Sequence, residues 1–228
     1  MIVGALVVAV LVAVVVFSLS SDDGPLGGLV GNDTPETPAF AFDAGKPKPV
    51  ETATKPDHEQ AAAAADAPAE AAVQRLDDLY TAAFLDPANW MEGNYDDVLE
   101  FFAGGARDAA EKQLDVLTAG PDAGAAFEKI RPMPSTLKVQ VLFDPEGLPR
   151  SIEGSARFVA RGTGPAGEIL LVSKGQFIFE KIDGEWLVVS FSVQRRDEER
   201  EARPGASSSP GSSESPGASA EPSEAEAS

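Results

Sequence analysis

The spacing of apolar residues changes once along this chain, at Pro134, and this change constrains the fold more than any other feature. Before Pro134, apolar side chains recur at intervals of three and four, as on one buried face of a helix. After Pro134 they recur at every second position, as in strands with one buried face. Helices followed by strands predict an α+β domain, with a helical layer packed on one curved antiparallel sheet.

The helical part is predicted to begin with a long amphipathic helix over 69–85. Asp66 and Pro68 are suited to its cap and first turn, and Asp86-Pro87 is suited to its end. Shorter helical pieces are expected over 95–102, 106–117 and 123–130.

The strand part is predicted to form a four-stranded antiparallel meander over 137–143, 152–161, 168–180 and 186–194. We expect a β-bulge at Lys174-Gly175, because the apolar face changes parity there. On the last strand, the side chains predicted to enter the core are Leu187, Val189, Phe191 and Val193, which leaves Trp186, Val188 and Ser190 on the other side.

The first twenty residues, MIVGALVVAVLVAVVVFSLS, are apolar and contain no charged side chain. A helix of this length spans the ~30 Å hydrocarbon core of a bilayer. We therefore expect a transmembrane anchor over 1–20, with a cleaved secretory signal ending near Ser20 as the alternative. Asp22 and Asp23 follow the run directly, which favours a single-pass protein of the cell membrane with its N-terminus inside and its C-terminal domain outside.

Two segments flank the predicted domain at 66–197. Residues 21–65 are rich in proline and acids, and we expect them to form a disordered stalk in which Phe40 and Phe42 are able to dock locally. Residues 198–228 consist mainly of Ser, Pro, Gly, Ala and Glu, and we expect a disordered tail there.

The formal net charge of −19 is distributed unevenly. Residues 73–130 carry twelve acids and four bases, whereas residues 131–197 carry eight acids and nine bases. Such an acidic chain is expected to bind neither nucleic acid nor anionic lipid surfaces. Four cations alternate outward on the predicted strands: Lys138, Arg157, Arg161 and Lys174. They predict a basic stripe that would suit an acidic partner or a neighbouring subunit. The alternative is a merely solvated sheet face.

Several sequence patterns together resemble a known superfamily. Leu79-Tyr80, Trp90, Asn94-Tyr95-Asp96 and the hairpin FEKIDGEWLV at 179–188 are similar to those of the nuclear transport factor 2-like, cone-shaped α+β proteins. With an apolar span and a proline-rich stalk, the chain resembles membrane-anchored members such as the Mce-associated membrane proteins and the assembly factors of conjugation and type IV secretion machines. The resemblance implies an accessory domain of the cell envelope or of a transport or secretion complex, whose partners are other proteins of that complex.

Enzyme chemistry is not expected. The chain has no cysteine, its one histidine (His58) lies in the stalk, and no motif for metal, phosphate or nucleophile chemistry occurs. The positions predicted to face inward on the strands carry no titratable group, so no catalytic residue and no cofactor are expected. Asp96, Asp97 and Glu100 fit a helix start, with a metal site as the alternative. The alternative to a non-catalytic domain is an isomerase-like or dehydratase-like enzyme of the same superfamily.

Three residues are the candidate contacts with a partner or at the mouth of the cone. Trp90 and Met91 lie between predicted helices, where an aromatic ring beside a thioether is either a lid over the mouth or an exposed anchor for a partner. Tyr80 is expected as a core tyrosine, with a role as hydrogen-bond donor in a cavity as the alternative. A further alternative is a cone that binds a lipid or a small apolar ligand.

Overall fold

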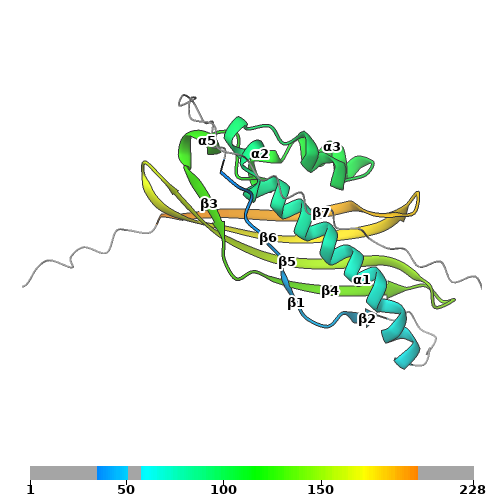
Figure 1. The fold of residues 1–228 in the computed structure, drawn as a ribbon. Coiled ribbons are helices and arrows are strands. Elements are labelled where there is room, and N and C mark those ends of the chain that lie inside the picture. Colours follow the sequence, from blue (N-terminus) through cyan, green and yellow to red (C-terminus); the bar gives the residue numbers. More distant parts are fainter. Residues whose placement is uncertain (1–34, 51–57, 200–228) are drawn as a thin grey trace, which may run out of the picture. The chain divides into compact units, whose positions relative to one another are not determined.

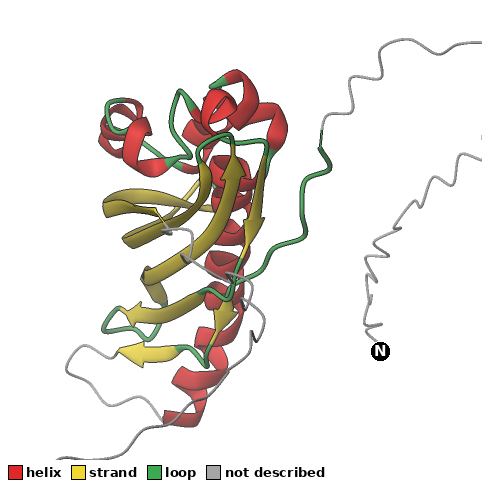
Figure 2. Cartoon of the chain, turned by 90° about the vertical axis from the view of Figure 1, so that its left-hand side faces the viewer, coloured by secondary structure: helices red, strands yellow, loops and turns green. Residues whose placement is uncertain are grey.

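The computed structural model describes residues 35–50 and 58–199, which form a mixed α+β fold. Figure 1 shows a long helix crossing one face of a single sheet, with the short helices gathered at one end. Figure 2 shows the same arrangement from the side. The expected α+β class, with helices before the main strands, is confirmed.

The sheet has seven strands in the order β1-β4-β5-β6-β7, with β2 also paired to β4 and β3 to β5. The expected meander is present as β4 to β7, but the prediction of a four-stranded antiparallel cone is wrong, because β1 and β2 add parallel pairs to β4. A parallel neighbour requires a long crossover, and here the whole helical layer supplies it. The strands are β1 (Asp43–Ala44), β2 (Lys48–Val50), β3 (Lys129–Pro132), β4 (Thr136–Phe143), β5 (Pro149–Gly164), β6 (Gly167–Ile182) and β7 (Glu185–Glu199).

The helical layer consists of one long helix and several short pieces. Asp86 caps α2, because its side chain accepts the Ala88 N–H at 3.0 Å, and Gly93, with φ at 66°, ends that helix. The pieces are α1 (His58–Tyr80), the π-helical turn η1 (Thr81–Leu85), α2 (Pro87–Glu92), the 3₁₀ helix η2 (Asp96–Phe101), α3 (Gly105–Glu111), α4 (Leu114–Leu117) and α5 (Ala123–Ala126).

Helix α1 begins earlier than predicted, so that Pro68 lies inside it rather than in its first turn. The alanine-rich run before Asp66 has a high helix propensity and extends the helix toward its N-terminus. Its buried face consists largely of small side chains, which allow a close approach to β4 and β5. That face carries Ala61, Ala65, Ala69, Ala72, Leu76, Leu79 and Tyr80.

Part of the expected stalk belongs to the folded unit. Phe42 is only 6% exposed, and its ring meets that of Tyr80 edge to face at 5.2 Å. Phe40 packs against Phe158 at 5.3 Å, and the Phe42 N–H donates to the Asp77 carboxylate at 2.8 Å. The expected docking of Phe40 and Phe42 is confirmed, whereas the expected disorder of 21–65 does not hold for residues 35–50 or for the start of α1.

The predicted register of β7 is wrong in its first half. Val188 is fully buried and Trp186 packs against the core, while Leu187 and Val189 are half-buried. The pairing of β6 with β7 shifts at Ile178/Phe179, which leaves Val189 as an extra residue and reverses the parity of the strand. Beyond the bulge, Phe191 and Val193 pack against the core as predicted.

No bulge occurs at Lys174-Gly175, because the register between β5 and β6 is continuous through both residues. The inner face of β6 carries the small residues Ser173 and Gly175 between its large apolar residues, so the apolar alternation is interrupted there although the register is not. Each small residue has a packing reason. Ser173 meets the hydroxyl of Tyr80, and a Cβ on Gly175 would lie 2.5 Å from the ring of Phe177.

Two predictions fall on segments outside the described residues. These are the anchor over 1–20 and the part of the predicted tail from 200 onward. The tail is expected over 198–228, but its first two residues, Glu198 and Glu199, belong to β7 and end that strand. Within the described residues, no helix combines the length and the apolar character needed to cross a membrane.

Candidate functional site

The space between the helices and the sheet is filled by aromatic and aliphatic side chains. The rings of Tyr80, Phe84 and Phe158 lie within 5.6 Å of one another, centroid to centroid. Among the described residues, the buried polar ones are Thr118, Ser135 and Ser173, and no charged residue is buried. The core therefore presents no ionised group to a ligand.

Tyr80, one of the three candidate contacts, lies in this core at 2% exposure. Its hydroxyl is 3.2 Å from the Ser173 hydroxyl. Burial raises the pKa of Tyr80 to about 12, and the hydrogen bond with Ser173 opposes this only in part. Tyr80 is therefore a neutral core residue at ordinary pH, and among the described residues its hydroxyl pairs with Ser173 and with no carboxylate.

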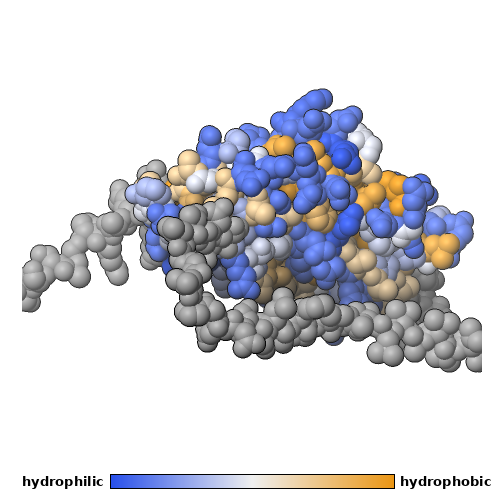
Figure 3. Space-filling model, turned by 45° about the horizontal axis from the view of Figure 1, so that its top comes forward, coloured by the Kyte–Doolittle hydropathy of each residue, from blue (hydrophilic) through white to orange (hydrophobic). Residues whose placement is uncertain are grey.

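The other two candidates, Trp90 and Met91, belong to α2 rather than to a loop. Trp90 is 1% exposed, and its buried indole N–H has no partner among the described residues. Met91 is 48% exposed. The surface around the short helices, seen in Figure 3, is mostly hydrophilic with apolar residues interspersed. Trp90 is thus buried while its neighbour Met91 faces solvent, so the two side chains do not form one exposed surface.

The carboxylates considered as an alternative metal site lie on the surface. Asp96, Asp97 and Glu100 are exposed at η2. Within residues 35–50 and 58–199, no three His, Cys, Asp or Glu side chains are grouped as metal ligands. The Asn94 side chain accepts the Asp96 N–H at 3.1 Å, which fits a local cap.

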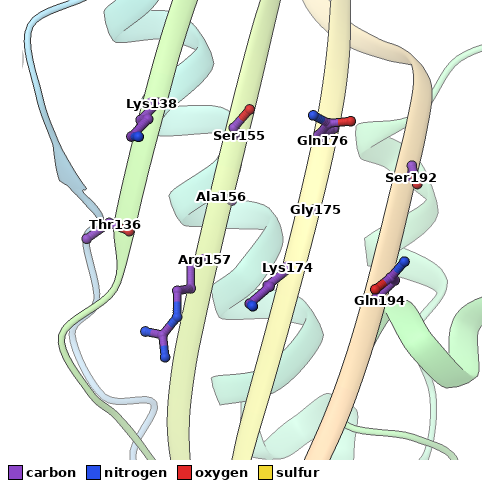
Figure 4. Close-up of a pocket in the computed structure, with 10 residues that line it drawn as sticks. All are labelled: Thr136, Lys138, Ser155, Ala156, Arg157, Lys174, Gly175, Gln176, Ser192 and Gln194. Atoms are coloured by element: carbon purple, nitrogen blue, oxygen red, sulfur yellow. The ribbon is translucent and has the colours of Figure 1, made fainter.

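A hollow of about 460 Å³ lies on the face of the sheet away from α1 (Figure 4). We call it the basic hollow, after its three cations, Lys138, Arg157 and Lys174. Around the cations lie hydroxyl and amide groups on four neighbouring strands. These further residues are Thr136, Ser155, Gln176, Ser192 and Gln194, with Ala156 and Gly175 at the base.

The strand register explains why the three cations meet. Arg157 on β5 lies directly opposite Lys174 on β6, and Lys138 on β4 lies opposite Ser155, two residues from Arg157. Paired residues point to the same face of a sheet, so alternation along each strand places all three on the outer side. Like charges directly opposite one another are locally destabilising. The basic hollow is therefore a place where an added anion is favourable.

None of the three cations forms a salt bridge with a described residue, whereas Arg161 lies 3.7 Å from Glu168. The predicted stripe is accordingly split. Lys138, Arg157 and Lys174 come together, and Arg161 lies further along β5 beside its own acid.

A second hollow of about 520 Å³ adjoins the first at the edge of β4 and shares Thr136 and Lys138 with it. It arises because Gly45–Pro47 loops out between the two short strands that pair with β4. This loop adds Lys46, and β2 adds Lys48, to the lining of the second hollow beside Lys138. Sequence reasoning missed both lysines because they lay in the expected stalk, although the run GKPKPV already pointed to a local basic cluster.

No protein-family model, no curated protein and no solved structure matches this chain. The filled core and the basic hollow are therefore the observations that bear on its function.

Proposed function

We propose that this chain is a non-catalytic interaction domain of the cell envelope, held at the outer side of the membrane by its N-terminal segment and serving a transport or secretion complex. The observation that carries the proposal is the grouping of Lys138, Arg157 and Lys174, without ion-pair partners among the described residues, on an open sheet face. Exposed cations gathered in this way favour an acidic partner, because complementary charge steers association and sets its specificity.

The packed core supports the absence of catalysis. General acid–base chemistry requires a titratable group within hydrogen-bond reach of a bound substrate. Tyr80, whose pKa is raised to about 12, stays protonated at ordinary pH. Asp77 is half-buried and accepts the Phe42 N–H, so its carboxylate is engaged in holding the N-terminal segment. Neither group is arranged to exchange protons with a ligand.

The resemblance to the nuclear transport factor 2-like superfamily is part of this proposal. A long amphipathic helix packed on a meander that ends in the Asp183-Gly184 hairpin supports it. The membrane-anchored members of that superfamily imply an accessory role beside other envelope proteins. The apolar run over 1–20 supports attachment to the membrane.

Crosslinking in intact membranes, followed by capture of the chain, tests the interaction. Changing Lys138, Arg157 and Lys174 to Gln should abolish the crosslinked partner, because the cations of the basic hollow are removed. The matched control changes one exposed Arg and two exposed Lys elsewhere, Arg107, Lys112 and Lys181, to Gln. Equal loss in both variants, or retention of the partner in both, would contradict the proposal.

Protease treatment tests the orientation. Protease added to spheroplasts should digest the domain, because the proposal places it outside the cytoplasm. Full protection of the domain until the membrane is lysed would show that it lies inside.

A further inference from the structure

We propose that the acidic C-terminal segment of this chain, residues 204–228, docks on the basic hollow and covers Lys138, Arg157 and Lys174. This inference goes beyond the proposed function. It assigns an occupant from the same chain to the surface that an outside partner would use.

The basic hollow has unsatisfied charge. Arg157 and Lys174 are opposite one another on strands about 4.8 Å apart, and Figure 4 shows both side chains projecting from the same face. The nearest carboxylates on that face by register are Glu153, diagonal from Lys138, and Asp43, which pairs with Thr136. Neither forms a salt bridge with one of the three cations. An oxyanion placed between the cations would relieve their repulsion.

The C-terminal segment has the complementary charge. After Arg203 the sequence contains four glutamates, no lysine and no arginine. Residues 73–130, which form most of the helical layer, carry twelve acids and four bases and repel such a segment. Residues 131–197, with nine bases to eight acids, are the more favourable surface. Three of these bases, none in a salt bridge with a described residue, gather in the basic hollow. The four glutamates are Glu214, Glu221, Glu224 and Glu226.

The segment starts close enough to reach the site. Gln194 lines the basic hollow, and β7 ends at Glu199, so the exit of the chain lies about 17 Å along the strand from the hollow. A Gly/Ser-rich chain has an end-to-end distance of about 5–6 Å times the square root of its length, which is about 21 Å at Glu214 and about 26 Å at Glu221. Tethering at this range gives an effective concentration of the order of millimolar.

The contact should depend on salt. Exposed ion pairs are individually weak, so several have to act together within the screening distance. That distance falls from about 10 Å at 0.1 M salt to about 3 Å at 1 M. Docking should therefore be clear at low ionic strength and lost at high ionic strength.

Zero-length carbodiimide crosslinking of the full chain, followed by digestion and mass spectrometry, tests the contact. We expect amide links from Lys138 or Lys174 to glutamates of 204–228. Mixing isotopically labelled and unlabelled chains separates links within one chain from links between two. The expected links lie within one chain and disappear at 1 M salt.

Amine labelling supplies a second measurement on the same chain. Changing the four glutamates of 204–228 to Gln should raise the labelling of Lys138 and Lys174 at least about twofold, as for a site covered at least half of the time. Labelling of Lys181, exposed at the hairpin beyond the hollow, should not change.

Three results would overturn the inference. Links between two chains would assign the basic hollow to a second copy. Links only to acids within 35–199 would show that the C-terminal segment does not dock there. Unchanged amine labelling of Lys138 and Lys174 in the Gln variant would show that these cations are not covered. Each result is distinguishable from failure of the proposed function, because capture of a membrane partner does not require the segment to dock. If the segment does dock, the Gln variant should capture more of an acidic partner than the unmodified chain.

Discussion

Replacing Val188 by Ala tests the β7 bulge most directly. Val188 is fully buried, so the change removes two methyl groups from the core. The lost transfer free energy is about 1.6 kcal/mol at ~0.8 kcal/mol per group. A residual cavity of roughly 50 Å³ adds about 1 kcal/mol at ~24 cal/mol per Å³. We expect unfolding to become easier by about 2–3 kcal/mol.

Val189→Ala is the matched control, because Val189 is the extra residue of the bulge and is half-buried. Its cost should be below ~1 kcal/mol, mainly through lost strand propensity. The backbone carbonyl of Val188 accepts the Ala103 N–H at 2.9 Å, and both variants keep this bond. The difference between the variants therefore reports on which side chain enters the core.

Urea titration of the two variants, followed by tryptophan fluorescence, measures this difference. The midpoint should fall much further for Val188→Ala, with the slope unchanged in both variants. A larger loss for Val189→Ala would refute the reasoning. It would mean that β7 runs without a bulge and places Leu187 and Val189 inside.

Three further predictions concern single residues. Asp77→Ala should cost about 1–3 kcal/mol in urea titration by leaving the Phe42 N–H without its acceptor, whereas Asp77→Asn should stay near the unmodified chain. Gly124→Ala should lower the free energy of unfolding by roughly 1–3 kcal/mol or more in thermal unfolding, because the added Cβ would lie 2.2 Å from the Met91 carbonyl oxygen. The control Gly105→Ala has open space around its Cβ and should leave the stability nearly unchanged. The pKa of Tyr80 is raised to about 12 in the folded chain, against 10 when unfolded. The stability that this shift contributes should be retained below pH 10 and lost as the pH rises toward 12. Absorbance near 295 nm should show the Tyr80 hydroxyl ionising only as the pH rises from 10 toward 12.

Periodicity predicted the parts of the fold in which one face is buried over several residues. The meander β4 to β7 follows from alternation, and the grouping of Lys138, Arg157 and Lys174 follows from the same alternation on the other face. The bulge in β7 could not be predicted, because both Leu187-Val189 and Trp186-Val188 give an apolar face. Only the pairing with β6 distinguishes the two.

The N-terminal strands escaped prediction for a different reason. β1 and β2 have two and three residues, which is too short for any periodicity, and they lie among prolines and lysines. Their position is determined by contacts distant in sequence, such as Phe42 with Tyr80 and Asp77. The second hollow depends on these strands, so its lysines could not be assigned to a site from composition alone.

The pairing of β1 and β2 with β4 has a consequence for how the chain acquires its structure. The segment around Phe42 and the apolar face of α1 are synthesised first, but β4 and β5, which cover them, come only after Pro134. Closing so long a loop costs entropy before any contact is gained, and folds rich in distant contacts form slowly. The first half of the domain therefore leaves the ribosome with its apolar surface uncovered. The surplus of carboxylates in the same stretch favours keeping nascent chains apart during that interval, before a core exists.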